Sequence, residues 1–342
     1  MIHYIITNRQ IEKKNGKEEI SEGNQLASDE IRFATFDTDS KKIIVIPDIK
    51  IKSNRISAYH IKKNEINLKG SVLVFRDLYL AMAKKTVNND LLVYIHGYAN
   101  DMDTVRENLI NAHKVFVSES GPIENIIAFA WPSNGNLLQY RDDKRDAEIS
   151  GFALGRSLQK LQQFFEEFFK VSQNEPCYNN IHILCHSMGN FVLESMMKAL
   201  IAQSTRLTTV FKEIVLVGAD VDDNVFEEFL PFSRLTDICE RVHIYYNKKD
   251  KALQISETTK NPFKRLGKYG PKKIINDLNV NIIDISATKP DRKHSLKDRF
   301  IHHWPHITTQ SVIDDINAVF SGIHADKIKK RHKTSLQNYF RL

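Results

Sequence analysis

The feature that most constrains this fold is a regular alternation, from about residue 90 onward, of short apolar runs with longer helical patterns. The apolar runs are Leu91–Ile95, Ile126–Trp131, Ile181–Cys185, Glu213–Gly218, Arg241–Tyr246 and Val280–Ser286. Helical spacing of apolar residues occurs over Thr104–Val117, Ala147–Lys170, Phe191–Ile201 and Val312–Phe320. Apolar strands that alternate with helices are typical of a mostly parallel sheet covered on both faces. Because crossovers between such strands are right-handed, we predict an α/β fold of the open three-layer sandwich type.

Residues 1–90 are less regular, and for them we predict a β-rich extension packed on that core. Strands are expected over Ile2–Thr7, Ile31–Phe36 and Lys42–Pro47, followed by a helix over Ser71–Lys84. Residues 9–30 are polar and indicate a loop, and residues 50–69 have room for one more strand.

The composition excludes several classes of protein. The chain has 342 residues, of which 42% are hydrophobic and 27% charged, as in a globular protein and unlike a disordered or fibrous one. Cys177, Cys185 and Cys239 form no Cys-x-x-Cys pair, so we expect reduced thiols rather than a disulfide framework or a cysteine zinc site. Since no run reaches about 18 apolar residues, we expect a cytoplasmic protein without a membrane-spanning or export segment.

The positive charge is concentrated near the C-terminus. Residues 326–342 hold six Lys or Arg and one acid, which is +5 of the formal net charge of +7. A basic tail on a nearly neutral body is weak support for nucleic-acid binding, and we do not expect a nucleic-acid partner. We expect a solvated or frayed tail, open to contact with a protein or a membrane surface.

The segment Cys185-His186-Ser187-Met188-Gly189 carries the strongest chemical signal. It lies where an apolar run turns into a helix, which is the position of a nucleophile elbow. Gly189 and the small Cys185 leave room for a tight turn that projects the Ser187 hydroxyl above the sheet. The N-terminus of the following helix favours negative charge that develops beside Ser187.

The segment Ile95-His96-Gly97-Tyr98 ends the first regular strand and predicts the other half of an oxyanion hole. Such a hole uses two backbone N–H groups, one from the residue after the nucleophile, here Met188, and one from a loop after an earlier strand. Gly97 permits a close approach of that loop, so the Tyr98 amide is the expected second donor.

A serine nucleophile needs a histidine that accepts its proton and an acid that orients the histidine. In the chain order of this fold the histidine follows the last strand, where His302 and His303 are both candidates, and we favour His302. The acid is expected after the penultimate strand, where Asp250 fits. Asp220 and Asp222, which follow the preceding strand, remain alternatives.

Several segments resemble one bacterial branch of the α/β-hydrolases, the esterase/lipase-like proteins long catalogued as a domain of unknown function. The matching pieces, within about residues 2–310, are Ile6–Arg9, Val93–Tyr98, Trp131–Ser133, Tyr140 with Asp142 and Asp143, Cys185–Asn190, Ala219–Asp222 and Asn247–Leu253. The resemblance implies a Ser/Asp/His hydrolase of ester-like substrates, with Ser187 and Asp250 at the family's positions. His302 keeps the family's spacing to an aromatic residue but lacks the preceding glycine, so His303 stays an alternative.

We therefore expect a serine hydrolase that cleaves a carboxylic ester or related acyl bond through an acyl-enzyme on Ser187. A small-molecule or lipid-like ester is the expected substrate, and no cofactor and no metal are expected. The alternatives are an acyltransferase or thioesterase with the same nucleophile, or a non-catalytic binding or effector module. The expected parts are an extension over 1–90, an α/β-hydrolase catalytic domain over 91–322 and the basic tail over 323–342.

Three other segments allow more than one interpretation. Residues 256–277 form a polar, lysine-rich insertion, for which a surface loop is slightly favoured over a lid or a pocket wall. Trp131-Pro132-Ser133 either lines the substrate cleft or forms a packed turn. Asp142 and Asp143 are typical of a helix start rather than of a metal site, because no histidine cluster accompanies them.

Overall fold

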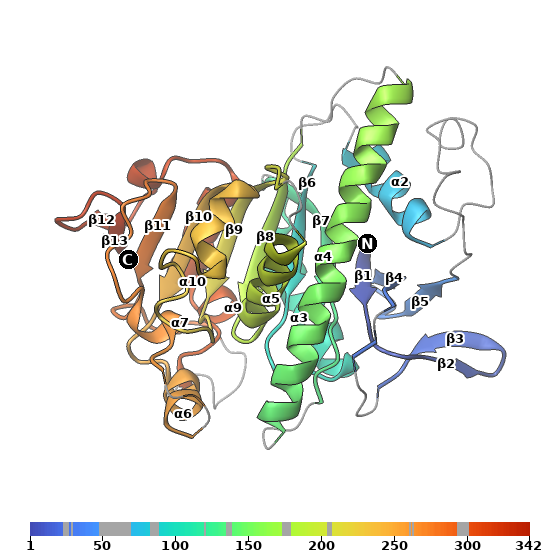
Figure 1. Ribbon diagram of the computed structural model, residues 1–342, viewed down its shortest axis with the longest axis horizontal. Helices are drawn as coiled ribbons and strands as arrows, with labels where there is room; N and C mark the ends of the chain where they lie inside the picture. The colour runs from blue at the N-terminus through green and yellow to red at the C-terminus, as the bar shows by residue number, and fades with distance from the viewer. Residues whose placement is uncertain are drawn as a thin grey trace.

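A computed structural model of the chain describes residues 1–22, 27–28, 30–47, 70–82, 89–119, 121–134, 139–172, 179–203, 207–259, 261, 263–292 and 301–342. Within these residues one sheet of 11 strands has the order β12-β13-β11-β10-β9-β8-β6-β7-β1-β4-β5, as Figure 1 shows. All neighbours from β13 to β1 are parallel, and β12, β4 and β5 are added antiparallel at the two edges. The predicted mostly parallel sheet is confirmed.

The bounds of the elements follow the expected alternation. The strands are β1 (Ile2–Thr7), β2 (Ile11–Lys14), β3 (Lys17–Ile20), β4 (Arg32–Asp37), β5 (Ile43–Ile46), β6 (Asp90–Ile95), β7 (Ile123–Phe129), β8 (Ile181–His186), β9 (Phe211–Val217), β10 (Cys239–Tyr246), β11 (Val280–Asp284), β12 (His332–Lys333) and β13 (Tyr339–Arg341). The helices are α2 (Ser71–Met82), α3 (Met102–Phe116), α4 (Tyr140–Ser172), α5 (Gly189–Ala202), α6 (Lys251–Thr259), α7 (Leu266–Tyr269), α9 (Pro305–Thr308) and α10 (Gln310–Phe320), with short 3₁₀ turns η2 (Pro231–Asp237) and η3 (Ala325–Lys327).

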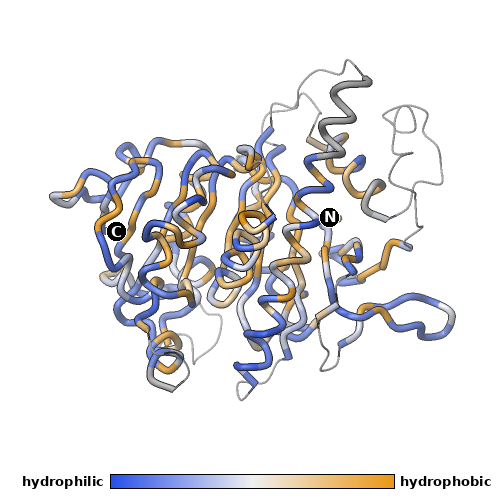
Figure 2. Tube along the Cα trace, viewed as in Figure 1, coloured by the Kyte–Doolittle hydropathy of each residue, from blue (hydrophilic) through white to orange (hydrophobic). Residues whose placement is uncertain are grey.

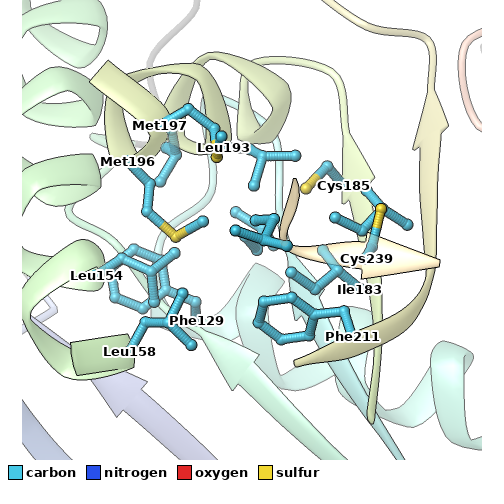
Figure 3. Close-up of a cluster of buried hydrophobic side chains, with 14 of the residues drawn as sticks. Phe129, Leu154, Leu158, Ile183, Cys185, Leu193, Met196, Met197, Phe211 and Cys239 are labelled. Atoms are coloured by element: carbon cyan, nitrogen blue, oxygen red, sulfur yellow. The ribbon is translucent and has the colours of Figure 1, made fainter. Parts of the chain in front are cut away.

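The alternation of side chains along the strands produces two apolar cores, one on each face of the sheet. Along β8, Ile183 and Cys185 join the core beneath α2, α4 and α5, while Leu184 joins the core beneath α3 and α10. In Figure 1, α4 and α5 lie in front of the sheet. Figure 3 shows Leu154 of α4 and Met196 of α5 gathered over the strands in the first of these cores. Burial on both faces explains why the central strands read as continuous apolar runs.

The N-terminal extension continues the central sheet. Tyr4 of β1 pairs with Ile127 of β7, and β4 and β5 follow as an antiparallel pair. The expected loop over residues 9–30 is wrong in part, because β2 and β3 form a hairpin there. Asn15 and Gly16 both have positive φ, as a tight hairpin turn requires. Figure 2 shows this hairpin as a mostly hydrophilic projection. The possible strand within residues 50–69 lies outside the described residues.

The C-terminal segment is part of the sheet, so the expectation of a solvated or frayed tail is wrong. β13 pairs in parallel with β11, and β12 pairs with β13. Phe340 is buried, and the guanidinium of Arg331 donates to the carboxylate of Asp315 at 2.7 Å and to the Tyr245 hydroxyl at 3.1 Å. The burial of Phe340 and the buried Arg331–Asp315 ion pair hold this segment in the sheet despite its basic composition. Within the part of the chain that the structure describes, no helix is both long and apolar enough to cross a membrane.

Two glycines one turn apart on α4 predict opposite effects on stability. A Cβ at Gly151 would lie 2.4 Å from the Ser195 Cβ on α5, whereas a Cβ at Gly155 would meet no atom closer than 3.6 Å. We expect Gly151→Ala to lower the free energy of unfolding by about 1–3 kcal/mol through overpacking. We expect Gly155→Ala to raise it by roughly 0.5–1 kcal/mol because alanine favours the helix. Urea unfolding checks both, and equal effects would contradict this packing of α4 on α5.

Candidate active site

The strand order changes direction at β6, and this marks where a site is expected. The chain passes from β6 to β7 on one side and then to β8 on the other side of β6. In open α/β sheets, ligands bind at the carboxyl ends of the strands at such a switch point. His96 and Gly97 follow the end of β6, and Ser187 follows the end of β8. The two strongest sequence motifs therefore lie side by side at this point.

Ser187 occupies a strained, tightly held turn between β8 and α5. Its φ is +54°, a conformation that non-glycine residues rarely adopt. Its N–H donates to the Val217 carbonyl at 3.0 Å, and its carbonyl accepts the Asn190 amide group at 2.9 Å. A Cβ at Gly189 would lie 2.4 Å from the Ile95 carbonyl oxygen, so this position requires glycine. The geometry is that of a nucleophile elbow.

Cys185, the departure from the usual glycine of the elbow, is accommodated in the core. Its side chain is fully buried in the cluster of Figure 3. Burial raises the pKa of the Cys185 thiol well above its usual range, so the thiol stays protonated. A protonated, buried thiol is not a competing nucleophile.

The loop after β6 approaches the serine closely. A Cβ at Gly97 would lie 2.8 Å from the Cβ of Ser187, so glycine is needed for this contact. Met188, the residue after the serine, is buried at the N-terminal cap of α5. The two segments that carry the expected oxyanion donors, the amides of Tyr98 and Met188, therefore flank Ser187. The partial positive charge at the N-terminus of α5 would further stabilise an oxyanion bound by these two amides.

His303 and Asp250 form a buried pair beside this turn. His303 Nδ1 lies 2.7 Å from Asp250 Oδ2, and both side chains are buried. The other carboxylate oxygen of Asp250 accepts the Leu253 N–H at 2.9 Å. A Cβ at Gly218 would lie 3.3 Å from the His303 ring, and Gly218 directly follows the carbonyl that binds the Ser187 N–H. The pair thus lies at the end of the strand next to the serine.

The preference for His302 over His303 needs correction. His302 is only partly buried, and among the described hydrogen bonds and ion pairs none joins its ring to Asp250. His302 has a φ of +56°, a left-handed conformation that reverses the direction of the chain there. The histidine that meets the acid is consequently its neighbour, His303. Burial lowers the pKa of His302 from its usual value.

The alternative acids have other partners. Asp220 accepts hydrogen bonds from the Tyr140 hydroxyl at 2.8 Å and the Ser256 hydroxyl at 2.9 Å. Arg265, which is buried, pairs with both Asp220 and Asp222. Asp250 is therefore the acid that this geometry brings to a histidine. Arg265 belongs to the segment 256–277.

Part of the segment 256–277 packs tightly on the loop after β9. Four backbone hydrogen bonds of 2.8–3.0 Å join the two segments: residue 264 to 223, 266 to 221, 267 to 219 and 272 to 223. A Cβ at Gly267 would lie 2.1 Å from the Ala219 nitrogen, so the two backbones are in direct contact. This part of the segment is therefore packed on the loop that follows Gly218, next to His303.

His186 is a functional candidate that the sequence reasoning did not single out. Its Nε2 lies 2.9 Å from the His303 carbonyl, which only accepts, so Nε2 carries a proton and donates. Its ring packs between the rings of His303 and His306, at centroid distances of 4.7 and 4.6 Å. Burial lowers the pKa of His186 well below its usual value, so it is neutral. This hydrogen bond joins the backbone at His303 to His186, the last residue of β8.

Among the described residues, no group of three or more His, Cys, Asp or Glu is arranged to hold a metal ion. Asp142 and Asp143 lie in the first turn of α4, as expected from the sequence.

The chain has an α/β-hydrolase fold. More particularly, it belongs to the family described as "Alpha/beta hydrolase of unknown function (DUF900)", whose model matches residues 77–319. A curated relative, the uncharacterized protein alr1448 of Nostoc sp. (strain PCC 7120), is 22% identical over 249 residues. That match covers 60% of this chain and 62% of the relative, so the chain spans less than two thirds of the relative's length.

A solved structure, the Aspergillus fumigatus lipase B, shares 14% sequence identity with the chain. The match covers 43% of this chain and 28% of that structure, with a TM-score of 0.27. A similarity this low supports no conclusion about fold or activity. Membership of the α/β-hydrolase family rests on the match to the family model.

Proposed function

We propose that this protein is a serine hydrolase that cleaves a carboxylic ester or related acyl bond through an acyl-enzyme on Ser187. The observation that carries the proposal is the buried His303–Asp250 pair beside the strained Ser187 turn. The close approach of Gly97 to Ser187 supports it, because an oxyanion hole needs the loop there. Family membership supports a hydrolase fold and leaves the substrate open.

In the proposed reaction, the Ser187 oxygen attacks the acyl carbonyl while His303 Nε2 accepts the hydroxyl proton. With its proton on Nδ1, His303 donates to Asp250, which orients the ring and stabilises the imidazolium that forms. The amides of Tyr98 and Met188 stabilise the oxyanion, and the proton on His303 passes to the leaving alcohol. Water, activated by the same imidazole, then attacks the acyl-enzyme and releases the acid and free Ser187.

Labelling with a fluorophosphonate probe tests the nucleophile directly. We expect wild-type protein and Cys185→Ala to be labelled and Ser187→Ala not to be, because the probe reacts with an activated serine and not with a buried, protonated thiol. Hydrolysis of short and long p-nitrophenyl esters should be lost with the labelling. Labelling that survives Ser187→Ala, or folded wild-type protein that is neither labelled nor active, would contradict the proposed function.

A further inference from the structure

The loop Gly97–Asn100, which follows β6, is held by side chains that come from three distant parts of the chain. The Ala99 N–H donates to Asp143 Oδ2 at 3.1 Å. The Asn100 N–H donates to the Ser133 hydroxyl at 3.1 Å, and the Asn100 carbonyl accepts from Arg9 Nη2 at 2.6 Å. These three backbone groups are bonded from outside the loop, so the shape of the loop depends on the three side chains.

The three side chains are also joined to one another. Ser133 donates its hydroxyl to Asp143 Oδ2 at 2.5 Å, and the Ser133 carbonyl accepts from Arg9 Nη2 at 3.1 Å. The second oxygen of Asp143 accepts the Asn134 N–H at 3.1 Å. Arg9, Ser133 and Asp143 are at most 2% exposed. We call these three residues the loop clamp.

The loop needs such support because its conformation is unfavourable by itself. Ala99 has a φ of +57°, which costs energy for a residue with a Cβ and persists only where the surroundings impose it. Inside the loop, the Asn100 side-chain amide donates to the carbonyls of Gly97 at 3.1 Å and Tyr98 at 2.6 Å. With the clamp outside and Asn100 inside, the peptide on each side of Tyr98 has its orientation fixed.

The loop clamp contains one residue of each charge sign, which matters because it lies near the expected oxyanion. Burial lowers the pKa of Arg9 to about 10 and raises the pKa of Asp143, and the opposite charge of each residue partly offsets this effect on the other. A lone buried carboxylate here would oppose negative charge on the substrate oxygen. The pair fixes the loop without adding net charge.

We propose that Arg9, Ser133 and Asp143 are positioning residues, which hold the loop Gly97–Asn100 so that the Tyr98 amide faces the carbonyl oxygen of the substrate at Ser187. The inference rests on the proposed function. It also gives one role to three segments that are far apart in the sequence: the strand end at Arg9, the Trp131–Ser133 turn and the start of α4. The Trp131–Ser133 turn is in this view a support for the oxyanion loop rather than a cleft lining.

The test compares Ser133→Ala with Ser150→Ala. Ser133→Ala removes the acceptor of the Asn100 N–H and the link to Asp143. Ser150, on α4, is equally buried, and its described hydrogen bonds join Asn8 and the Asp146 carbonyl rather than the loop, so Ser150→Ala is a matched control. We expect Ser133→Ala to lower kcat on a short p-nitrophenyl ester by roughly 10- to 100-fold with KM little changed, since the loss falls on the transition state.

Two further readouts separate positioning from general destabilisation. The affinity for a trifluoromethyl ketone, which forms a tetrahedral oxyanion on serine, should fall in parallel with kcat for Ser133→Ala. Hydrogen exchange at Ala99 and Asn100 should become faster in Ser133→Ala and in Asp143→Asn. Ser150→Ala should leave all three measurements near the wild-type values even if it lowers the unfolding midpoint as much.

Loop exchange that stays unchanged in both clamp variants would overturn the inference, as would a loss of kcat in Ser150→Ala equal to that in Ser133→Ala. A folded Ser133→Ala with faster loop exchange and full kcat would overturn it as well. Failure of the proposed function is seen separately, as wild-type protein that Ser187-directed probes do not label. The exchange measurement needs no turnover and then decides by itself whether the clamp holds the loop.

Discussion

Replacement of His303 by alanine is expected to lower kcat by about 10⁴-fold or more, close to the effect of losing the nucleophile, because the groups of a triad act as a unit. His302→Ala is expected to keep most of the activity, since the described hydrogen bond to Asp250 comes from His303 and not from the partly exposed His302 ring. Steady-state hydrolysis of a p-nitrophenyl ester measures both. The pair is a matched test, because the two histidines are adjacent in the chain.

The comparison also separates catalysis from folding. His303 is buried, so circular dichroism and urea unfolding of His303→Ala have to show a folded protein before its kcat is interpreted. Asp250→Asn is expected to reduce kcat by about 10⁴-fold with little loss of stability, because it disturbs the orientation and tautomer of the imidazole. If His302→Ala removes activity while His303→Ala keeps it, the assignment of the base is wrong.

Deletion of residues 326–342 is expected to leave the chain unable to form a stable native state. The deletion removes the buried Phe340, whose loss alone costs about 3–5 kcal/mol in a typical core. It also leaves the Asp315 carboxylate buried without Arg331, a further cost of about 3–5 kcal/mol. Together these approach or exceed the total stability of many proteins. Soluble yield and the cooperativity of thermal unfolding measure the outcome.

If the shortened protein does not fold, single substitutions at Arg331 and Lys333 test the same prediction. Arg331→Met should lower the unfolding midpoint strongly, and Lys333→Ala hardly at all, since Lys333 and its partner Asp326 are both at least a third exposed. If the deleted chain unfolds with the wild-type midpoint and keeps its activity, the C-terminal segment is not an integral part of the sheet.

The apolar runs predicted the central strands, the helices α2 to α5 and α10, and the place of Ser187 between a strand and a helix. They carry this information because strands buried on both faces exclude polar residues, and because a nucleophile elbow needs small neighbours such as Gly189. Asp250 was proposed as the acid for a similar reason: it lies four residues after the end of the apolar strand β10, where turn residues are brought to the site.

What the sequence did not reveal depends on contacts between distant residues or on a single backbone angle. The choice between His302 and His303 depends on the positive φ of His302, for which the residue type gives no signal. Asp220 is bonded by Tyr140, Ser256 and Arg265, which are 80, 36 and 45 residues away, so nothing in the sequence indicated that these partners hold its carboxylate. The β2–β3 hairpin was different, because Asn15-Gly16 is a strong turn signal that the polar composition obscured.

The place of β1 in the sheet has a consequence for how the chain is synthesised and folds. β1 pairs with β4 on one side and with β7 on the other, and Tyr4 meets Ile127 only after seven further described elements, β2, β3, β4, β5, α2, β6 and α3, have been made. Until then, the antiparallel meander β1-β4-β5 has an unpaired edge of apolar residues, the kind of edge that pairs with other chains. Long-range parallel pairing is also slow, because loop closure precedes any stabilising contact. Nascent chains that end before β7 should therefore aggregate readily and depend on chaperones during translation.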